Sequence, residues 1–355
     1  MVLFNLILFL KKLNYCLINL NSWAKNCLIN NRFFISDIVK DKLLKFFNKR
    51  LISLEIEVFL NSIFNRFTPI NTIKMPSILE LEKTASQVRR DIVRMVNAVN
   101  SGHPGGSLGC ADFLVALYFE ILNHHPTQFN MDGTNEDIFF LSNGHISPVF
   151  YSVLARSGYF PVSELSTFRK LNTRLQGHPT THDGLPGIRI ASGSLGQGLS
   201  VALGAAQTKK LNNDKGIIYT LHGDGEIQEG QIWEAAMYAA HNKVDNIIST
   251  IDYNLKQIDG DISDVLDLGD LNAKWQAFGW DVMEMNGNNM TAVVKTLNEA
   301  KTHLGKEKPV MIIMKTEMGQ GVDFMMGTHK WHGNAPSNEQ LTVALAQLEE
   351  TLGDY

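Results

Sequence analysis

The sequence predicts an α/β fold in which helices cover both faces of a mostly parallel sheet. Short apolar runs bounded by turn-forming residues alternate with segments whose apolar residues recur every three or four positions. The composition fits a globular chain, since 44% of the 355 residues are hydrophobic and 19% are charged. Because strands that alternate with helices pair in parallel, we expect ligands to bind at the carboxyl ends of the strands.

The expected elements can be followed along the chain. Strands are expected at residues 137–142, 216–221, 246–251, 280–285 and 309–315. The first expected helix leads into the glycine-rich turn NSGHPGGSLG at 100–109, and its apolar stripe consists of Leu81, Ala85, Val88, Ile92, Met95 and Val99. Further helices are expected at 110–122, from 147, at 268–278 and from 291. Two more are marked by apolar positions, which are Leu199, Ala202, Leu203 and Ala206 in one and Trp233, Ala236, Met237 and Ala240 in the other.

The composition changes abruptly near residue 75. Residues 1–74 hold 11 Lys and Arg against 4 Asp and Glu, nine of the 19 phenylalanines and none of the 28 glycines. The rest of the chain holds 21 Lys and Arg against 32 Asp and Glu. A secretory signal would carry its positive charge ahead of the apolar stretch, whereas MVLFNLILFLKK places its lysines after it. We therefore expect an extra segment at 1–74, outside the fold, and one domain at 75–355, and we favour this over a secretory signal or an organellar presequence.

The composition also disfavours several classes of protein. The three cysteines show no CxxC spacing, which argues against a disulfide framework or a zinc site and fits a reducing, cytoplasmic compartment. No apolar run reaches the roughly 18 residues that a membrane span needs. The acidic part after residue 74 offers no basic stripe for nucleic acid. We therefore expect neither a membrane nor a nucleic acid as a partner.

Polar residues stand at the ends of two expected neighbouring strands. The tripeptide GDG at 223–225 follows one apolar run and precedes a helix, and Asn254 closes the next run. Small residues let a ligand approach the backbone, whose N–H groups can bind phosphate oxygens. A carboxylate, an amide oxygen and a nearby carbonyl are hard oxygen ligands that suit Mg²⁺. The pattern therefore indicates a clamp for a metal diphosphate, although GDG alone is equally compatible with a plain turn.

The motifs of the chain, taken together, resemble those of transketolases. GDG followed by Asn254 resembles the family's thiamine diphosphate motif, and NSGHPGGSLG, LSNGH, GHP and SGSLGQG precede it in the same order as in the family. The resemblance covers about residues 75–336. It is to the amino-terminal section of transketolases that are split into two chains. The implied fold is the family's diphosphate-binding domain.

The resemblance implies thiamine diphosphate and Mg²⁺, or Ca²⁺, as cofactors. In the family, the metal is held by the aspartate of GDG, by the asparagine and by the main-chain oxygen two residues beyond it; these are Asp224, Asn254 and Lys256 here. Lys256 departs from the aliphatic residue that is usual at its position, which is harmless if only its carbonyl binds. The positions implied to contact the cofactor are His145, Gly193, Leu195, Gly223, Gly225 and Asn254.

Three further histidines match active-site positions of the family. Imidazole suits proton transfer because it can donate or accept a hydrogen bond near neutral pH. The resemblance implies that His103 and His332 face oxygens of the donor sugar and the acceptor, and that His178 positions the C1 hydroxyl of the donor. The implied reaction is the transfer of a two-carbon ketol unit from a ketose phosphate to an aldose phosphate, as in the pentose phosphate pathway.

Two glutamates and the missing pyrimidine-binding domain indicate that the chain associates with other subunits. Glu229 and Glu234 match subunit-interface positions of the family, although a carboxylate in the first turn of a helix is also explained by the helix dipole. The family's pyrimidine-binding domain, with the glutamate that activates the cofactor, has no counterpart here. We therefore expect a half-enzyme that is inactive alone, exposes a large apolar docking surface, and pairs with a carboxyl-terminal subunit in a heterotetramer.

Three alternatives stay open at this point. The chain could belong to another thiamine diphosphate-dependent enzyme, either one like 1-deoxyxylulose-phosphate synthase or a transketolase for an unusual sugar. It could also be a non-catalytic module that binds the cofactor. A nucleotide-binding enzyme is less favoured, because the sequence has neither GxGxxG nor a Walker A lysine.

Overall fold

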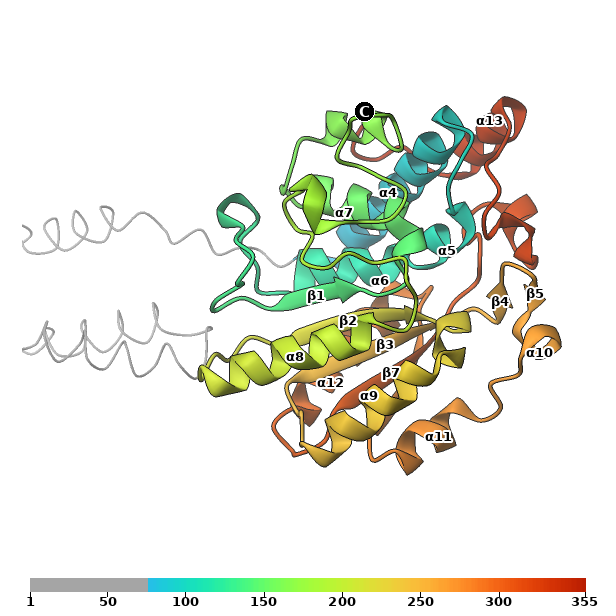
Figure 1. Cartoon of the computed structure of the whole chain (residues 1–355). Helices are drawn as coiled ribbons and strands as arrows, with labels where there is room; N and C mark the ends of the chain where they lie inside the picture. The colour runs from blue at the N-terminus through green and yellow to red at the C-terminus, as the bar shows by residue number, and fades with distance from the viewer. Residues whose placement is uncertain (1–75) are drawn as a thin grey trace, which may run out of the picture. The chain divides into compact units, whose positions relative to one another are not determined.

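The computed structural model describes residues 76–355, so the predicted extra segment at 1–74 lies outside the described residues. Within this range, five parallel strands form one sheet in the order β1-β2-β3-β7-β6 (Figure 1). The strands are β1 (Ile138–Leu141), β2 (Ile218–Gly223), β3 (Ile247–Tyr253), β6 (Asp281–Asn286) and β7 (Val310–Lys315). Each coincides with an apolar run from which a strand was predicted, so the predicted fold class is confirmed.

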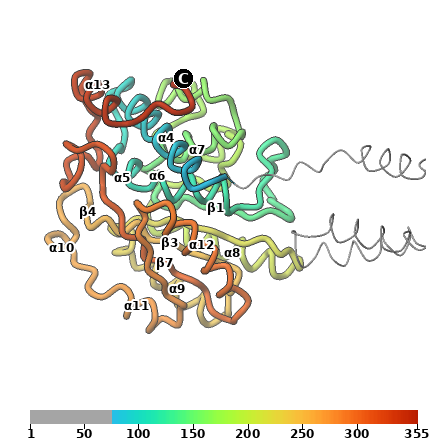
Figure 2. Tube along the Cα trace, turned by 180° about the vertical axis from the view of Figure 1, so that it is seen from behind, coloured from blue at the N-terminus to red at the C-terminus, as the bar shows by residue number. Residues whose placement is uncertain are grey.

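Helices cover both faces of the sheet, as the sequence predicts. One face carries α8 (Gly198–Leu211), α9 (Gly230–His241) and α11 (Leu271–Ala277), and Figure 1 shows α8 and α9 side by side. The other face carries α4 (Ile78–Ala98), α6 (Ala111–Ala116), α7 (Ser147–Arg156) and α12 (Met290–His303), and is seen from behind in Figure 2. Successive residues of a strand point to opposite faces, so Phe139 joins the core under α4 while Phe140 joins the core under α8.

The first described helix shows why these elements form where they do. Ser77 caps α4 by accepting a hydrogen bond from the backbone N–H of Glu80, whose side chain accepts one from the backbone N–H of Ser77. The predicted apolar stripe of this helix is buried from Leu81 to Met95, while Val99, its last predicted member, follows the end of the helix and is half-buried. The cap fixes where α4 begins, and the apolar stripe packs into the larger of the two apolar cores of the described residues.

Several local predictions were wrong or incomplete. The expected glycine-rich turn contains a short helix, α5 (Pro104–Gly109), in which every residue is buried, so that packing outweighs the low helix propensity of glycine. The helix expected at 110–122 is α6 followed by a π-helical turn, η1 (Leu117–Ile121). Four elements were not predicted from the sequence: the strands β4 (Lys256–Gln257) and β5 (Gly260–Asp261) and the helices α10 (Ile262–Val265) and α13 (Asn338–Gln347).

The register of the sheet aligns the ends of β2 and β3. Gly223 on β2 pairs with Asp252 on β3, so the residues that follow these two strands emerge at the same edge. The backbone N–H of Asp224 donates to the carbonyl of Asp252, 3.2 Å away, which extends the pairing by one step. Among residues 76–355, no helix combines the length and the apolar character that crossing a membrane would require.

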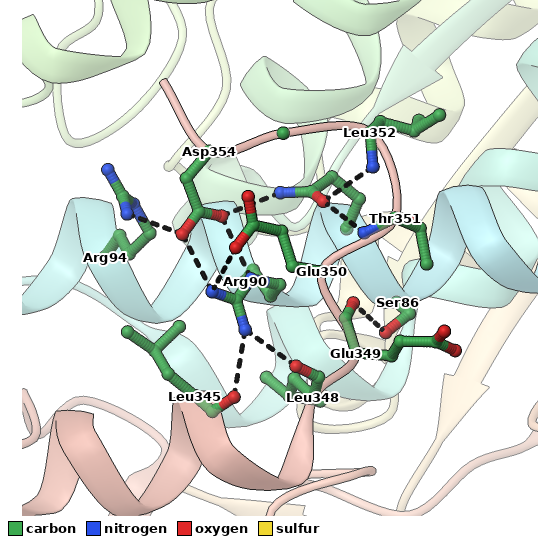
Figure 3. Close-up of polar contacts among 12 residues, drawn as sticks. Ser86, Arg90, Arg94, Leu345, Leu348, Glu349, Glu350, Thr351, Leu352 and Asp354 are labelled. Carbon is green, nitrogen blue, oxygen red and sulfur yellow. Dashed lines mark hydrogen bonds and ion pairs between the residues drawn. The ribbon is translucent and has the colours of Figure 1, made fainter.

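The last residues of the chain lie against α4 (Figure 3). The carboxylate of Asp354 accepts hydrogen bonds from the side chains of Arg90, at 2.8 and 2.9 Å, and of Arg94, at 2.7 Å. The guanidinium of Arg90 also donates to the carbonyls of Leu345 and Leu348. These bonds hold the end of the chain on the helix that precedes the glycine-rich segment.

We predict that Asp354→Asn lowers the free energy of unfolding by about 1 kcal/mol at pH 7, because solvent screens this partly exposed carboxylate. Hydrogen bonds from Arg90 lower the pKa of Asp354 to about 2, from an ordinary value of 3.8. A lowered carboxyl pKa stabilises the fold above pH 4, and this contribution is lost as the pH falls toward 2. Urea unfolding at pH 7 and pH 3 measures the difference. Glu350→Gln is the control, because the Glu350 side chain is 54% exposed and lies 3.5 Å from Arg90. Equal stability of Asp354→Asn and the natural chain at pH 7 would contradict the prediction.

Candidate active site

Asp224 is buried at the edge where β2 and β3 end, and its exposed fraction is 2%. Its Oδ1 accepts a hydrogen bond from the backbone N–H of Gly225 at 2.8 Å, and its Oδ2 accepts one from the backbone N–H of Leu255 at 2.6 Å. The second bond joins the loop after β2 to the loop after β3. The predicted metal ligands Asp224 and Asn254 are therefore brought into adjacent loops.

Asn254 is oriented by a buried carboxylate that was not predicted from the sequence. Its Nδ2 donates to Oδ2 of Asp252 at 2.8 Å, and Asp252 also accepts from the hydroxyl of Thr316. The amide oxygen of Asn254 is thereby turned away from Asp252, and it accepts from the backbone N–H of Lys256 at 2.9 Å. The amino group of Lys256 pairs with Asp261 at 2.7 Å. The charge of Lys256 is thus engaged within the β4-β5 hairpin.

The electrostatics of this edge suit a cation. Burial and the neighbouring charge of Asp252 raise the pKa of Asp224 to about 8. Within the described residues, neither Asp224 nor Asp252 forms an ion pair, and no three His, Cys, Asp or Glu side chains are grouped to hold a metal. A divalent cation held by one carboxylate together with amide and carbonyl oxygens would supply the missing positive charge. The donor set that is present therefore fits Mg²⁺.

Glycines let the SGSLGQG loop pack closely on its neighbours. Gly193 has φ +129°, and a Cβ there would lie 2.9 Å from the ring of His178. Gly196 has φ +87°, and a Cβ there would lie 2.8 Å from Cβ of Glu229. L side chains rarely adopt either conformation. Leu195, between them, is 37% exposed. The loop thus connects the histidine side of the site with the GDG side.

Glu226 joins three loops of the site, and it was missed in the sequence because it follows GDG as an ordinary helix-start glutamate. It is 1% exposed. Its carboxylate accepts hydrogen bonds from the hydroxyl of Ser142 after β1, from the backbone N–H of Gly196 at 2.9 Å, and from the backbone N–H of Gly223 at 3.1 Å. Only the arrangement in space reveals this role, since the three donors are far apart in the sequence.

The four predicted histidines lie in one cluster. The ring of His103 is centred 5.2 Å from His145, 6.2 Å from His178 and 5.6 Å from His332, and the rings of His145 and His332 stack 4.9 Å apart. His103 directly precedes α5, His145 lies in the turn η3 (Gly144–Ile146) after β1, and His332 follows the turn η8 (His329–Trp331). Four separate segments therefore converge on this cluster.

The cluster is held in its neutral form. Burial, with the charges of His332, Arg169 and His178, lowers the pKa of His103 to about 4. Burial also lowers the pKa values of His145, His178 and His332. Neutral imidazoles can both donate and accept hydrogen bonds, which suits contacts to sugar hydroxyls.

Four of the buried polar atoms that lack a hydrogen-bond partner belong to the histidine-bearing loops and their neighbours. They are Nδ1 of His103, Nδ1 of His332, Oδ1 of Asn143 and Oγ of Ser192, none of which has a hydrogen-bond partner among the described residues. Such atoms are rare in folded proteins and indicate a missing ligand or ordered water. These residues therefore fit a polar cofactor or substrate.

Glu229 and Glu234 belong to the start of α9. Glu229 stands at the N-cap position of α9 without a capping hydrogen bond from its side chain, Glu234 follows in the second turn, and both are exposed. The same surface exposes Val201 of α8 at 44%, Met237 at 55% and Tyr238 at 50%. The buried face of α9 is instead formed by Ile232, Ala235, Ala236 and Ala239, so the predicted grouping of Met237 with Ala236 does not describe the packed face.

Residues 81–353 match the family described as "Transketolase, thiamine diphosphate binding domain". The chain belongs to this family. It is 39% identical, over 76% of its own length, to an apulose-4-phosphate transketolase subunit of Actinobacillus succinogenes and covers 96% of that protein. It is 38% identical, over 77% of its length, to a 6-deoxy-6-sulfo-D-fructose transketolase subunit of Clostridium sp. and covers 97% of it.

Solved transketolases have the same fold. The structure from Campylobacter jejuni matches 76% of this chain with a TM-score of 0.69 at 36% identity, and that from Leishmania mexicana matches 79% with a TM-score of 0.70 at 30% identity. The chain spans 42% and 43% of those solved chains, respectively. It thus corresponds to less than half of a single-chain transketolase, but to nearly the whole of the separate subunits.

We predict that Glu226→Gln lowers the free energy of unfolding by about 1–3 kcal/mol, because the amide nitrogen would face a donor where the carboxylate accepts one. Urea unfolding at pH 7 measures the change. Glu234→Gln replaces an exposed glutamate and serves as the control, with an expected change within about 0.5 kcal/mol. A Glu226→Gln chain as stable as the natural one would show that the three loops do not depend on this carboxylate.

We predict that the contribution of the histidine cluster to the free energy of unfolding falls as the pH is lowered from about 6.5 to about 4. In this window, the unfolded chain binds protons at histidines that stay neutral in the fold, so protonation favours unfolding. Replacing His103 by Gln should reduce the slope of the free energy of unfolding against pH by up to about 1.4 kcal/mol per pH unit. Equal slopes for the His103→Gln chain and the natural chain would show that His103 does not stay neutral in the folded chain over this pH range.

Proposed function

We propose that this chain is the cofactor-binding subunit of a split transketolase. The complete enzyme would transfer a two-carbon ketol unit from a ketose phosphate to an aldose phosphate in the cytoplasm. One observation carries the proposal: the clustered histidines lie beside the strand-end loops of Asp224 and Asn254, in a chain that matches separate transketolase subunits over nearly their whole length.

The strand-end loops would hold thiamine diphosphate through a metal. Asp224, Asn254 and the carbonyl of Lys256 would bind Mg²⁺, or Ca²⁺, and the backbone around Gly223 and Gly225 would contact the diphosphate. Gly193, Leu195 and His145 would contact the cofactor on the adjacent side, and the unpartnered polar atoms of Ser192 and Asn143 support this. When bound, the cofactor supplies the electron sink that C–C cleavage requires.

The histidines would bind the sugars. His103 and His332 have unpartnered buried Nδ1 atoms, so each can form a new hydrogen bond to a substrate oxygen. His178 lies against Gly193 and would position the C1 hydroxyl of the donor. Because these imidazoles are neutral, they can hold or pass a proton between hydroxyl and carbonyl oxygens at pH 7.

A second chain would complete the site. The helix α8 has apolar residues on both sides, since Leu199 and Leu203 are buried while Val201 is 44% exposed. Next to it, α9 exposes Met237 and Tyr238 together with Glu229 and Glu234. Exposed apolar residues on neighbouring helices are typical of a protein interaction surface. We assign this surface to self-association and to docking of a carboxyl-terminal, pyrimidine-binding subunit, giving a heterotetramer.

The sugar could differ from those of the pentose phosphate pathway. The two subunit relatives act, by their names, on apulose 4-phosphate and on 6-deoxy-6-sulfo-D-fructose. Their resemblance to this chain supports a transketolase for an unusual sugar as the second candidate. Both candidates share the same cofactor chemistry and differ in the donor.

We predict ketol transfer from xylulose 5-phosphate to ribose 5-phosphate only when this chain is mixed with the carboxyl-terminal transketolase subunit of the same genome, thiamine diphosphate and Mg²⁺. Loss of a residue that only supports a metal ligand typically lowers activity about 10- to 100-fold. Because Asp224 is itself a proposed ligand, Asp224→Asn should reduce the rate by about 100-fold or more. Asp132→Asn, at an exposed position, is the matched control. A coupled assay of glyceraldehyde 3-phosphate release measures the rate.

The same mixture separates the candidates. Transfer from apulose 4-phosphate or 6-deoxy-6-sulfo-D-fructose without transfer from xylulose 5-phosphate would favour the unusual-sugar candidate. Full activity of this chain without a partner would contradict the split-subunit proposal.

A further inference from the structure

The loop at residues 167–177, here called the bracing loop, packs against the segment that carries His103. The ring of Phe168 is 1% exposed and faces Gly102, whose added Cβ would lie 3.4 Å from the ring. Next to it, Nη1 of Arg169 donates to Oγ of Ser101 at 2.8 Å. Arg169 has φ +53°, a left-handed conformation that is uncommon for a large side chain. Two neighbouring residues of the bracing loop thus contact two residues that directly precede His103.

The same guanidinium packs against the segment that carries His178. A Cβ at Gly177 would lie 2.8 Å from Cζ of Arg169 and 2.9 Å from its Nε, so the guanidinium lies flat on the backbone one residue before His178. The carbonyl of Gly177 accepts from the hydroxyl of Ser147 at 2.7 Å, which fixes this backbone to α7. Arg169 is therefore placed between the two histidine-bearing segments.

The charge of Arg169 has no counter-ion within the described residues. No ion pair involves it, and its buried Nε has no hydrogen-bond partner. Other arginines nearby are paired, since Arg174 contacts Glu164 at 2.7 Å and Arg189 contacts Glu136 at 3.0 Å. A partly buried, unpaired guanidinium costs stability. Arg169 is therefore not explained by a gain in stability, and its position between the histidine-bearing segments indicates a role in the site.

We propose that Arg169 is a positioning residue that braces the His103 segment against the His178 segment and thereby fixes the spacing of the histidine cluster. One planar group contacts both segments, which a lysine ammonium on a flexible stem does not reproduce. The consequence for catalysis rests on the proposed function, in which these histidines bind the donor sugar. The brace itself is a property of the folded chain.

The electrostatic surroundings agree with this placement. The positive charge of Arg169 contributes to the lowered pKa of both His103 and His178. The other groups that act on His103 are His332 and His178, while Asp259 and His329 act on His332. Removing the guanidinium should therefore move the titration of His103 and His178 upward, toward the ordinary value of 6.5.

The test uses the full chain and the variants Arg169→Met, Arg169→Lys and Gly177→Ala. Histidine ring C–H signals, assigned with single histidine variants, are titrated by NMR. We expect Arg169→Met to raise the midpoints of His103 and His178. Gly177→Ala retains the arginine but displaces its guanidinium, so the signals of the same two histidines should shift. Arg174→Lys, an arginine of the same loop paired with Glu164, is the control and should change neither.

The second readout is kinetic and uses the mixture with the carboxyl-terminal subunit. For Arg169→Lys and Gly177→Ala, we expect KM for the ketose phosphate to rise several-fold with a smaller change in kcat, because misplaced histidines weaken sugar binding. A purely structural role would instead lower the active fraction at constant KM. If the mixture shows no transfer at all, the proposed function fails. The NMR titration still decides whether Arg169 positions the His103 and His178 segments.

Two outcomes would overturn the proposal. Unchanged His103 and His178 titrations in Arg169→Met would show that the guanidinium does not act on these rings. If Arg169→Met does not fold, Gly177→Ala decides in its place, and unchanged histidine signals in this variant would overturn the brace.

Discussion

The parallel pairing of β2 with β3 is the constraint on which the site depends. Its register brings Gly223 level with Asp252, so that the chain leaves both strands at the same height. The bond from the Leu255 backbone to Asp224 then joins the two loops that follow. A shift of one residue would turn each side chain to the opposite face of the sheet and separate Asp224 from Asn254. The ladder of backbone bonds in the core thus determines where the oxygen ligands lie.

Buried polar side chains fix the positions of the loops that follow the strands. Asp252 orients the amide of Asn254, Glu226 gathers the loops after β1 and β2 with the SGSLGQG loop, and Arg169 lies between two histidine segments. None of the three is needed to bury apolar surface, and each is costly to hold away from water. Their common property is that each fixes residues that are distant in the sequence. The rigidity of the site comes from these groups, while the apolar cores supply the scaffold.

The sequence alone predicted the sheet and its helices because those features leave local signals, and the resemblance of its motifs to transketolases pointed to four histidines that the structure brings together. Strand runs such as 309–315 are apolar and bounded, and the histidines stand in recognisable glycine-containing motifs. The missed features depend on tertiary packing. The α5 helix forms from glycines because its surroundings bury it completely. Glu226 and Arg169 have ordinary neighbours in the sequence, and only folding brings their hydrogen-bond partners within reach.

The two-sided apolar character of α8 has a consequence for the amount of the protein in a cell. Molecules whose outer α8 and α9 surface stays uncovered keep Val201, Met237 and Tyr238 in contact with water. Chaperones and proteases act on such exposed apolar surface, so molecules in excess are removed. The steady level of this chain would then follow the supply of whatever covers the helix, and balanced synthesis of the two would matter as much as the stability of either.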